Sequence, residues 1–372
     1  RLARAGKKVC LLERGREITL GEFPESAEAL ARELQFEDDT GQNRLGLFDL
    51  HADTPVSVMV GCGLGGTSLI NANVSIEPDP RVFLDGRWPA ALVKDLGSLQ
   101  LGYARARDVL QPKPFPETVP PLGKLEAHRL SAQRMGREKD FRIVELNVRF
   151  EDGPNAVGEE QKKCTLCGNC ASGCNAGSKG ALTMNYLPDA RVHGATLVTQ
   201  AQVRHVARAG SRWAVHFVPV EDRVPLDPGT PTQFVLADVV VVAAGAIGST
   251  EILLRSGRLG LPLSSQVGLH FSGNGDQLSF AYDSDRACNG LGWTPGKTRK
   301  EPGVGPTITS AIYIRGETVN EDVLIEEGAI PASLGGAAPW ALALTSFWEA
   351  GHLPAWLGVK RAASMTQTYL IM

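Results

Sequence analysis

The sequence predicts an α/β protein, in which a Rossmann-like domain with a parallel sheet is joined to a second, α+β domain built on an antiparallel sheet. Two apolar runs, residues 8–12 and 235–243, predict the first domain, because they have the composition of parallel strands covered on both faces. Two shorter runs, residues 308–314 and 323–325, predict the second domain. They lie among looser segments that contain Gly and Pro, as strands of an antiparallel sheet often do.

The composition favours a globular protein that acts on small molecules. The chain has 372 residues, of which 43% are hydrophobic, enough for a sizeable core and two domains. Its 38 basic and 41 acidic residues give a net charge of −3, which offers no electrostatic argument for binding nucleic acid or an anionic membrane. The most apolar late stretch, residues 335–348, contains a Pro and is shorter than the roughly 18 residues of a spanning helix. We therefore expect no integral membrane segment.

The first predicted strand ends in an acid, Glu13. The second strand of a Rossmann unit presents an acid at this position to the ribose hydroxyls of an adenosine cofactor. Residues 1–6 are predicted to form a helix that leads into the strand. The glycine turn that should precede this helix does not occur in the sequence, which starts with Arg1. We therefore expect an internal fragment of a longer protein, with an incomplete Rossmann-like domain.

A glycine cluster, residues 61–66, follows a predicted strand at residues 56–60. Three of its glycines satisfy the G-x-G-x-x-G pattern of a pyrophosphate turn. The following residues, 67–76, are rich in Asn and β-branched residues and are a poor crossover helix. We interpret the cluster instead as a loop along a bound cofactor, where missing Cβ atoms let backbone amides approach a phosphate or an isoalloxazine ring. A plain tight turn is the alternative.

Three segments in this order resemble the FAD-binding elements of the glucose–methanol–choline (GMC) oxidoreductases, specifically those of the cholesterol-oxidase-like branch. They are the strand ending in Glu13, residues 61–78 and residues 242–256. The resemblance covers nearly the whole chain and implies three regions. These are an FAD-binding domain at 1–82 and 180–262, a helical and loop insertion at 83–179, and a substrate domain at 263–372 whose C-terminal part is missing.

The resemblance also implies contacts along the whole length of FAD. The backbone of Val203 is expected at the adenine, Glu13 at the ribose, and Ala244 and Gly245 near the ADP half. The glycine loop and the residues after it are expected to follow the pyrophosphate and reach the flavin. The pyrophosphate residues are Gly63, Gly65, Gly66, Thr67 and Ser68, the flavin neighbours are Asn71 and Ala72, and Gly61 is a further cofactor-binding residue at the start of the loop.

Four of the seven cysteines occur within eleven residues, a pattern unlike a disulfide framework and typical of a reducing, cytoplasmic compartment. Their C-x2-C-x2-C-x3-C spacing is that of bacterial ferredoxins, in which such a loop holds a [4Fe–4S] cluster. The four are Cys164, Cys167, Cys170 and Cys174.

Two features separate this loop from the ferredoxin pattern. Residue 175 is Asn where ferredoxins usually carry Pro, and in two-cluster ferredoxins the fourth cysteine serves the other cluster. Cys174 would have to fold back, or else Cys10, Cys62 or Cys288 would have to serve. Cholesterol oxidase carries no cluster, so the resemblance does not supply one. A cluster, a zinc ion and free or structural thiols stay open as three hypotheses.

Few residues are candidates for catalysis. His270 and Asn274 follow the flavin-domain strand where this family turns toward its substrate domain, so they could line a cavity or form a solvated turn. Glu326 lies in an alternating run that could point it inward as a general base. The alternative is that Glu326 and Glu327 are two surface glutamates at a strand end.

The resemblance implies an FAD-dependent oxidoreductase acting on CH–OH groups, with hydride transfer to flavin N5 and oxygen or another electron acceptor. The donor could be a sterol, a sugar, a long-chain alcohol or a hydroxylated terpene. The usual base of the family, a His paired with Asn or His, lies beyond residue 372, so we expect the fragment alone to be inactive. The alternatives are a flavin/iron–sulfur electron-transfer dehydrogenase and a non-catalytic remnant.

Overall fold

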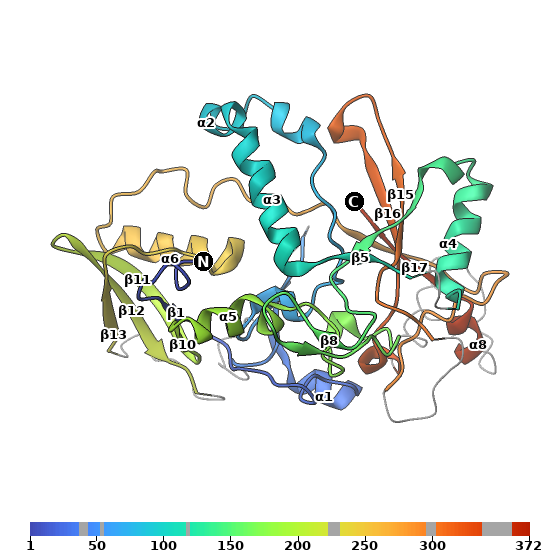
Figure 1. Cartoon of the computed structure of the whole chain (residues 1–372), viewed down its shortest axis with the longest axis horizontal. Coiled ribbons are helices and arrows are strands. Elements are labelled where there is room, and N and C mark those ends of the chain that lie inside the picture. Colours follow the sequence, from blue (N-terminus) through green and yellow to red (C-terminus); the bar gives the residue numbers. More distant parts are fainter. Residues whose placement is uncertain (37–43, 53–55, 117–119, 222–230, 295–302, 337–358) are drawn as a thin grey trace. The chain divides into compact units, whose positions relative to one another are not determined.

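The computed structural model describes residues 1–36, 44–52, 56–116, 120–221, 231–294, 303–336 and 359–372 (Figure 1). The chain divides into two compact units, and each unit is made of several separate segments. Unit 1 comprises Arg1–Ile18, Arg32–Gly66 and Ala190–Asn274, and unit 2 comprises Thr19–Ala31, Thr67–Asp189 and Gly275–Met372. The predicted insertion at 83–179 thus belongs to the same unit as most of the predicted substrate domain.

Unit 1 contains a two-stranded sheet of β1 and β10 and two three-stranded sheets, of order β2-β3-β4 and β11-β12-β13. β1 pairs with β10 and β2 pairs with β3 in the parallel direction, and the helix α6 packs against β11. The elements are β1 (Cys10–Leu12), β2 (Leu34–Phe36), β3 (Phe48–His51), β4 (Val58–Gly61), β10 (Thr196–Val198), β11 (Ala201–Ala209), β12 (Arg212–Pro219), β13 (Gln233–Ala237) and α6 (Gly245–Arg258).

The first predicted strand is confirmed as β1, although it is only half-buried. Its Cys10 is exposed, and its two leucines are partly covered. The predicted helix at residues 1–6 is wrong, because this segment forms turns that are closed by hydrogen bonds such as Ala5 N–H to the Arg1 carbonyl at 3.0 Å. Six residues that include a glycine with a φ of 72° are too few to offset the cost of starting a helix.

The prediction of a central parallel strand at residues 235–243 is also wrong. The first part forms β13, which pairs with β12 in the antiparallel direction, and residues 238–243 belong to no strand. Val240 and Val242 still pack on the core of unit 1, while Val239 and Val241 are 76% and 71% exposed. The β-branched run thus produces an extended backbone with alternating burial, but no strand in the described part of the chain pairs with residues 238–243.

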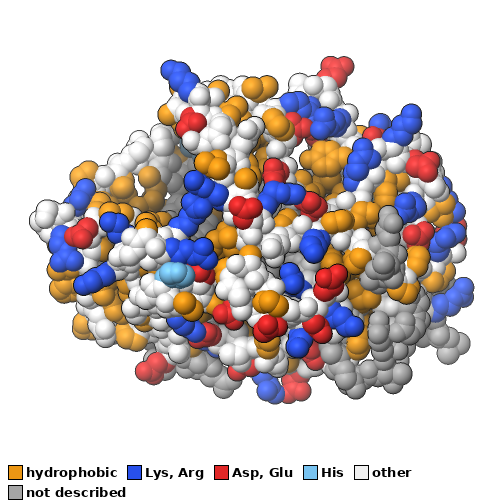
Figure 2. All heavy atoms as spheres, viewed as in Figure 1, with side chains coloured by type: hydrophobic (Ala, Val, Ile, Leu, Met, Phe, Trp, Pro, Cys, Tyr) orange, Lys and Arg blue, Asp and Glu red, His pale blue; other side chains and the backbone are white. Residues whose placement is uncertain are grey.

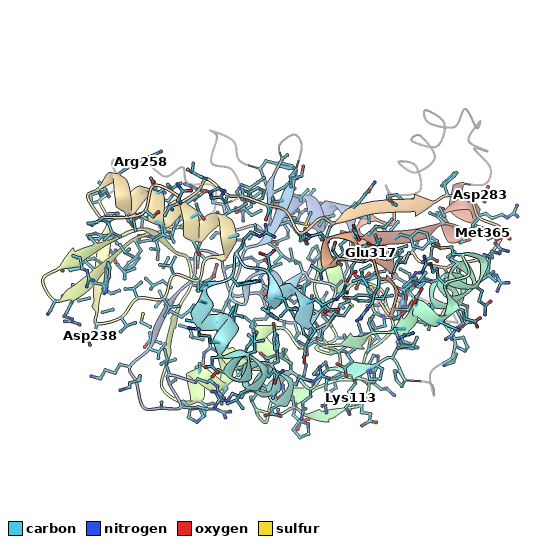
Figure 3. The ribbon with its side chains drawn as sticks, turned by 90° about the horizontal axis from the view of Figure 1, so that it is seen from above. Lys113, Asp238, Arg258, Asp283, Glu317 and Met365 are labelled. Carbon is cyan, nitrogen blue, oxygen red and sulfur yellow. The ribbon has the colours of Figure 1, made fainter. Side chains whose placement is uncertain are left out.

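The core of unit 1 lies between α6 and the sheet of β11 and β12. Val206, Val215 and Ile252 form its buried centre, and the hydroxyl of Ser256 accepts the N–H of Val206 at 2.9 Å. The helix ends at Arg258, which is labelled in Figure 3 together with Asp238, the residue that follows β13. Arginines in the last turn of α6 also suit the negative end of the helix dipole.

Unit 2 is organised around a five-stranded sheet of order β14-β17-β16-β15-β6, in which every pairing is antiparallel. Helix α4 contacts β15, β16 and β17. The sheet and its helix are β6 (Phe141–Ile143), β14 (Gln277–Ala281), β15 (Ser310–Ile314), β16 (Val323–Gly328), β17 (Gln367–Ile371) and α4 (Gly123–Arg134). The strands predicted near 308–314 and 323–325 are therefore present.

The remaining helices and strands of unit 2 are short, apart from α3. They are α2 (Ala90–Lys94), α3 (Leu96–Leu110), β5 (Lys113–Pro114), β7 (Glu145–Leu146), β8 (Gly153–Pro154), β9 (Glu160–Gln161) and α8 (Val359–Ser364). Two helices each contain a boundary between the units, namely α1 (Ala27–Arg32), at residues 31 and 32, and α5 (Tyr186–Val192), at residues 189 and 190. At the end of the sheet, Asp283 and Met365 lie close together (Figure 3), and Ser284 N–H donates to the Met365 carbonyl at 3.0 Å.

The surface carries charges of both signs. Figure 2 shows Lys and Arg side chains interspersed with Asp and Glu on the face it draws, with no area given over to one sign. Within the described ranges, no helix combines the length and the apolar composition that crossing a bilayer requires. Most of the apolar stretch at 335–348 lies outside the described residues.

Candidate cofactor and active site

Glu13 stands at the end of β1, as the sequence predicts. Its N–H donates to the Val198 carbonyl at 2.8 Å, which continues the ladder between β1 and β10 by one residue. One carboxylate oxygen accepts the Gly15 N–H at 2.7 Å. Burial raises the pKa of Glu13, and this backbone hydrogen bond opposes the rise. The turn after the strand thus holds the carboxylate in a defined position.

The glycine loop packs directly on this turn. Gly63, Gly65 and Gly66 have φ values of 152°, 113° and 57°, a region that favours glycine. A Cβ built on Gly15 would overlap the backbone of Gly63, so these two segments of the backbone are in direct contact. The Leu64 N–H also donates to the Arg16 carbonyl at 2.9 Å. This cradle without Cβ atoms, next to an acid, fits the adenosine and pyrophosphate part of FAD.

The other ADP-side candidates belong to the same unit. Val203 packs on the core that also contains Leu12 of β1. The register of β11 against β12 shifts between Val203 and His205, so the backbone leaves the regular ladder where the family resemblance places the adenine. Gly245 begins α6 with a φ of 72°, and Ala244 before it provides no side-chain cap. Such a helix start suits a phosphate.

The remaining candidates, Thr67 and Ser68 for the pyrophosphate and Asn71 and Ala72 for the flavin, follow in the chain and belong to unit 2. Ser68 accepts the Leu182 N–H on its hydroxyl at 3.0 Å, and Asn71 is exposed while its carbonyl accepts the Lys179 ammonium at 2.7 Å. Ala72 is half-buried and packs on the core beside the five-stranded sheet. Thr67 is exposed at the start of this segment.

Asn73 is a residue that the sequence reasoning missed. It is 2% exposed, it has a φ of 69°, and both polar atoms of its side chain are buried without a hydrogen-bond partner among the described residues. An amide in this state costs free energy unless a ligand or a water satisfies it. The signal in the sequence that could have identified Asn73 is its position two residues after Asn71, in the segment that follows the glycine loop.

Glu326 and Glu327 are both buried, so the alternative of two surface glutamates is wrong. Each is at most 1% exposed, and adjacent residues of a strand point to opposite faces of its sheet. Glu327 faces α4, where its carboxylate pairs with the Lys124 ammonium at 3.1 Å. Residues that pair directly across antiparallel strands share a face, so Glu326 lies with Ala311 and Leu370 on the other side.

The Glu326 face is the one that meets the flavin-side segment. Ala311, Leu324 and Leu370 belong to the same hydrophobic cluster as Ala72 and Val74. Glu326 Oε1 is buried and has no hydrogen-bond partner within the described part of the chain. Burial raises the pKa of Glu326 to about 7, and the charges of Glu327 and Asp276 add to the effect. This carboxyl group can therefore exchange a proton near neutral pH.

His270 and Asn274 do not show the character of catalytic residues. Both are exposed in unit 1, and His270 Nε2 is 2.8 Å from Gln266 Oε1 in an irregular segment. The solvated turn, which was the alternative in the sequence, describes them best.

The four clustered cysteines are free and line one cavity in unit 2, so Cys174 does fold back toward the other three. The backbone turns at Leu166, Gly168 and Gly173, with φ values of 57°, 79° and 103°. Among the described residues, no three His, Cys, Asp or Glu side chains are close enough to hold a single metal ion. The geometry around the cavity thus does not support a mononuclear zinc site.

Asn175 takes the place of the ferredoxin Pro for a structural reason. Its side-chain oxygen accepts the N–H groups of Gly21 and Phe23 at 2.9 and 3.1 Å, and its amide nitrogen donates to the Phe23 carbonyl and to Glu25, both at 3.0 Å. These four hydrogen bonds fasten the segment at 21–25 to the end of the cysteine loop. A Pro could make none of them.

We expect Gly15→Ala to reduce both the stability of the protein and its FAD content. The added Cβ overlaps the Gly63 backbone, so the glycine loop must move, and overpacking of this kind costs about 1–3 kcal/mol. FAD released per chain and urea unfolding measure the two effects. Gly86→Ala is the control, since a Cβ there meets nothing within 4 Å. Unchanged FAD content in Gly15→Ala would show that the contact between Gly15 and Gly63 is not needed for FAD binding.

Comparison with known proteins agrees with this geometry. A family model described as GMC oxidoreductase matches residues 25–271. An uncharacterized GMC-type oxidoreductase of Mycobacterium tuberculosis (strain CDC 1551 / Oshkosh) is 31% identical over 276 residues, which are 72% of this chain and 38% of that protein. A cholesterol oxidase of the same strain is 27% identical over 300 residues, or 75% of this chain and 49% of the relative.

A cholesterol oxidase of Acinetobacter baumannii is 25% identical over 218 residues, which are 55% of this chain and 37% of that protein. The chain therefore spans less than half the length of each of these three relatives.

Proposed function

Because this chain belongs to the GMC oxidoreductase family, whose members generally bind FAD, we propose that the protein oxidises the CH–OH group of a small-molecule alcohol. The observation that carries the proposal is the position of Glu326. It is a buried carboxyl group, one oxygen of which has no hydrogen-bond partner among the residues that the structure describes, and it lies on the sheet face that packs against Ala72. Sterol-like alcohols are the first donors to test, since two relatives are named cholesterol oxidases.

The residues divide the work in a simple way. Glu13, the loop at 61–66, Val203 and the start of α6 would bind the ADP half, and Asn71, Ala72 and Asn73 would lie beside the flavin. Bound FAD supplies the hydride acceptor. Glu326 in its ionised form accepts the hydroxyl proton of the alcohol, so that loss of a hydride and a proton converts CH–OH to a carbonyl. The apolar cluster around Ala311 and Leu370 keeps water away from this carboxylate.

The proposal is tested by anaerobic addition of alcohols to the purified full-length protein that contains this chain, since the chain alone is expected to be inactive, with the flavin absorption bands as the readout. We expect the bands to bleach with at least one member of a panel of a sterol, a sugar, a long-chain alcohol and a terpene alcohol. Deuterium on the carbinol carbon should slow the bleaching, because hydride leaves from that carbon. Bound FAD that no alcohol reduces, or a preparation that never binds FAD, would refute the proposal.

A second candidate is a flavin/iron–sulfur dehydrogenase that passes electrons to an acceptor other than oxygen. One specific observation favours it, namely that four free thiols surround a single cavity. A non-catalytic remnant has no such observation in its favour, since the buried carboxyl of Glu326, whose Oε1 has no partner among the described residues, is costly to keep without a use.

A further inference from the structure

We infer that the cavity lined by Cys164, Cys167, Cys170 and Cys174 is a preformed binding site for a [4Fe–4S] cluster, with Lys179 as its positioning residue. All four side chains line the same cavity, and none is in a disulfide. In a cubane each thiolate binds a different iron, so the sulfurs surround a space and do not converge on one point. That arrangement agrees with four cysteines around a cavity and with the lack of a three-ligand mononuclear site in the described chain.

The loop is built to stay folded around this cavity. Its glycines leave room for covering side chains: a Cβ on Gly168 would come within 2.7 Å of Val304, and a Cβ on Gly173 would overlap the ring of Phe23. Asn175 fastens the Phe23 segment to the loop with four hydrogen bonds. Val304 is 2% exposed and Phe23 is 8% exposed, so both are buried against the glycine turns that line the cavity. Low solvent exposure is one of the factors that set cluster potentials.

A buried positive charge lies at the wall of the cavity. Lys179 is 3% exposed, and its ammonium donates to the carbonyls of Leu69, Asn71 and Cys170 at 2.9, 2.7 and 3.0 Å. None of these acceptors is a carboxylate, and a buried ion that has no counter-charge in the described part of the chain is costly. Four thiolates around a cluster carry the negative charge that balances this ammonium. Ser178, which is 2% exposed, also lines the cavity with a hydroxyl that lacks a partner among the described residues.

The same lysine connects the cavity to the flavin-side segment. Its hydrogen bonds to Leu69 and Asn71 on one hand and to Cys170 on the other join two parts of unit 2 through a single ammonium group. A role as electron relay rests on the proposed function, whereas the cluster site does not. Two one-electron transfers, from reduced flavin through the cluster to a one-electron acceptor, reoxidise the flavin, and its protons pass to water.

The site is tested by iron and acid-labile sulfide analysis of anaerobically purified protein, before and after reconstitution with ferrous iron and sulfide. We expect about four irons and four sulfides per chain and an electron paramagnetic resonance signal after reduction with dithionite. Cys170→Ser should lose most of the iron. Cys288→Ser should keep it, because Cys288 is a buried cysteine of the same unit that does not line the cavity.

A wild-type measurement covers the case in which Cys170→Ser fails to fold. The four thiols should resist alkylation by iodoacetamide in the cluster-loaded protein and react after the iron is removed with a chelator. Absence of iron and sulfide after reconstitution, or one zinc ion per chain in their place, would overturn the site. FAD is assayed separately, so a cluster without alcohol-dependent flavin reduction would refute only the proposed function.

Lys179→Met tests the positioning role. We expect the cluster to remain and its midpoint potential to become more negative, since the positive charge that favours the reduced cluster is lost. Lys179→Arg should restore most of the potential, and the exposed neighbour Lys163→Met should leave it unchanged. An unaltered potential in Lys179→Met would show that the lysine only supports the fold.

Discussion

Glu326→Gln is expected to lower kcat for alcohol oxidation by about 10²- to 10⁴-fold, while FAD stays bound. The amide keeps the shape and the burial of the side chain but cannot accept the hydroxyl proton. Stopped-flow measurement of anaerobic flavin reduction isolates this step from reoxidation. Glu317→Gln is the control, because Glu317 is exposed after β15 and should leave the rate unchanged. Full activity in Glu326→Gln would show that Glu326 is not the base that accepts the hydroxyl proton.

The pH dependence gives a second measurement on the same variant. Burial raises the pKa of Glu326 from the usual 4.5 to about 7, so the rate of flavin reduction in the wild type should fall as the pH drops through about 7. The folded protein also binds a proton that the unfolded chain releases in this range. The stability that Glu326 contributes is therefore lost as the pH rises from about 4.5 to 7, by up to about 3 kcal/mol. Unfolding of Glu326→Gln should lack that component of the pH dependence.

Lys124→Met is expected to lower the free energy of unfolding by about 3–5 kcal/mol, because it leaves the Glu327 carboxylate buried without its counter-ion. Lys124 and Glu327 are 1% and 0% exposed, and the ammonium lies 3.1 Å from the carboxylate. The Thr309 N–H also donates to both carboxylate oxygens at 3.1 Å, but a neutral donor does not replace the charge. Urea unfolding at neutral pH measures the loss.

Two further variants separate the buried charge from the loss of packing. The double variant Lys124→Met/Glu327→Leu should regain most of the stability, because no unpaired charge is left. Arg134→Met is the control on the same helix: its ion pair with Asp285 is exposed, so the change should stay below about 1 kcal/mol. A double variant as unstable as Lys124→Met alone would show that packing, and not the charge, causes the loss.

The local motifs were legible in the sequence because their parts lie within a few residues of one another. The acid at the end of β1 depends on six consecutive residues, and the glycine loop depends on six more. The cysteine spacing predicts that the thiols gather in one place. The role of Asn175 depends on its hydrogen bonds to Phe23 and Glu25, which only the structure shows. The resemblance to GMC oxidoreductases rested on these local segments and is confirmed by the family match.

The errors concern partners that are distant in the sequence. The run at 235–243 is extended, as its composition predicts, but β12, and not a parallel neighbour, pairs with its first part. The sequence leaves open that Glu326 and Glu327 are surface residues, because a strand end in the sequence does not show what covers it. Helix α4, about 200 positions earlier, covers one face, and the segment around Ala72 packs on the other.

By itself, the sequence determined which chemical groups this protein carries and in what local arrangement: an acid after a strand, a loop without Cβ atoms and four spaced thiols. Only the tertiary structure decided that two adjacent glutamates face opposite sides of a sheet, and that Lys179 connects the thiol cavity to Asn71. The physical reason is that backbone geometry follows from neighbouring residues, whereas burial and charge pairing depend on surfaces that folding brings together from distant parts of the chain.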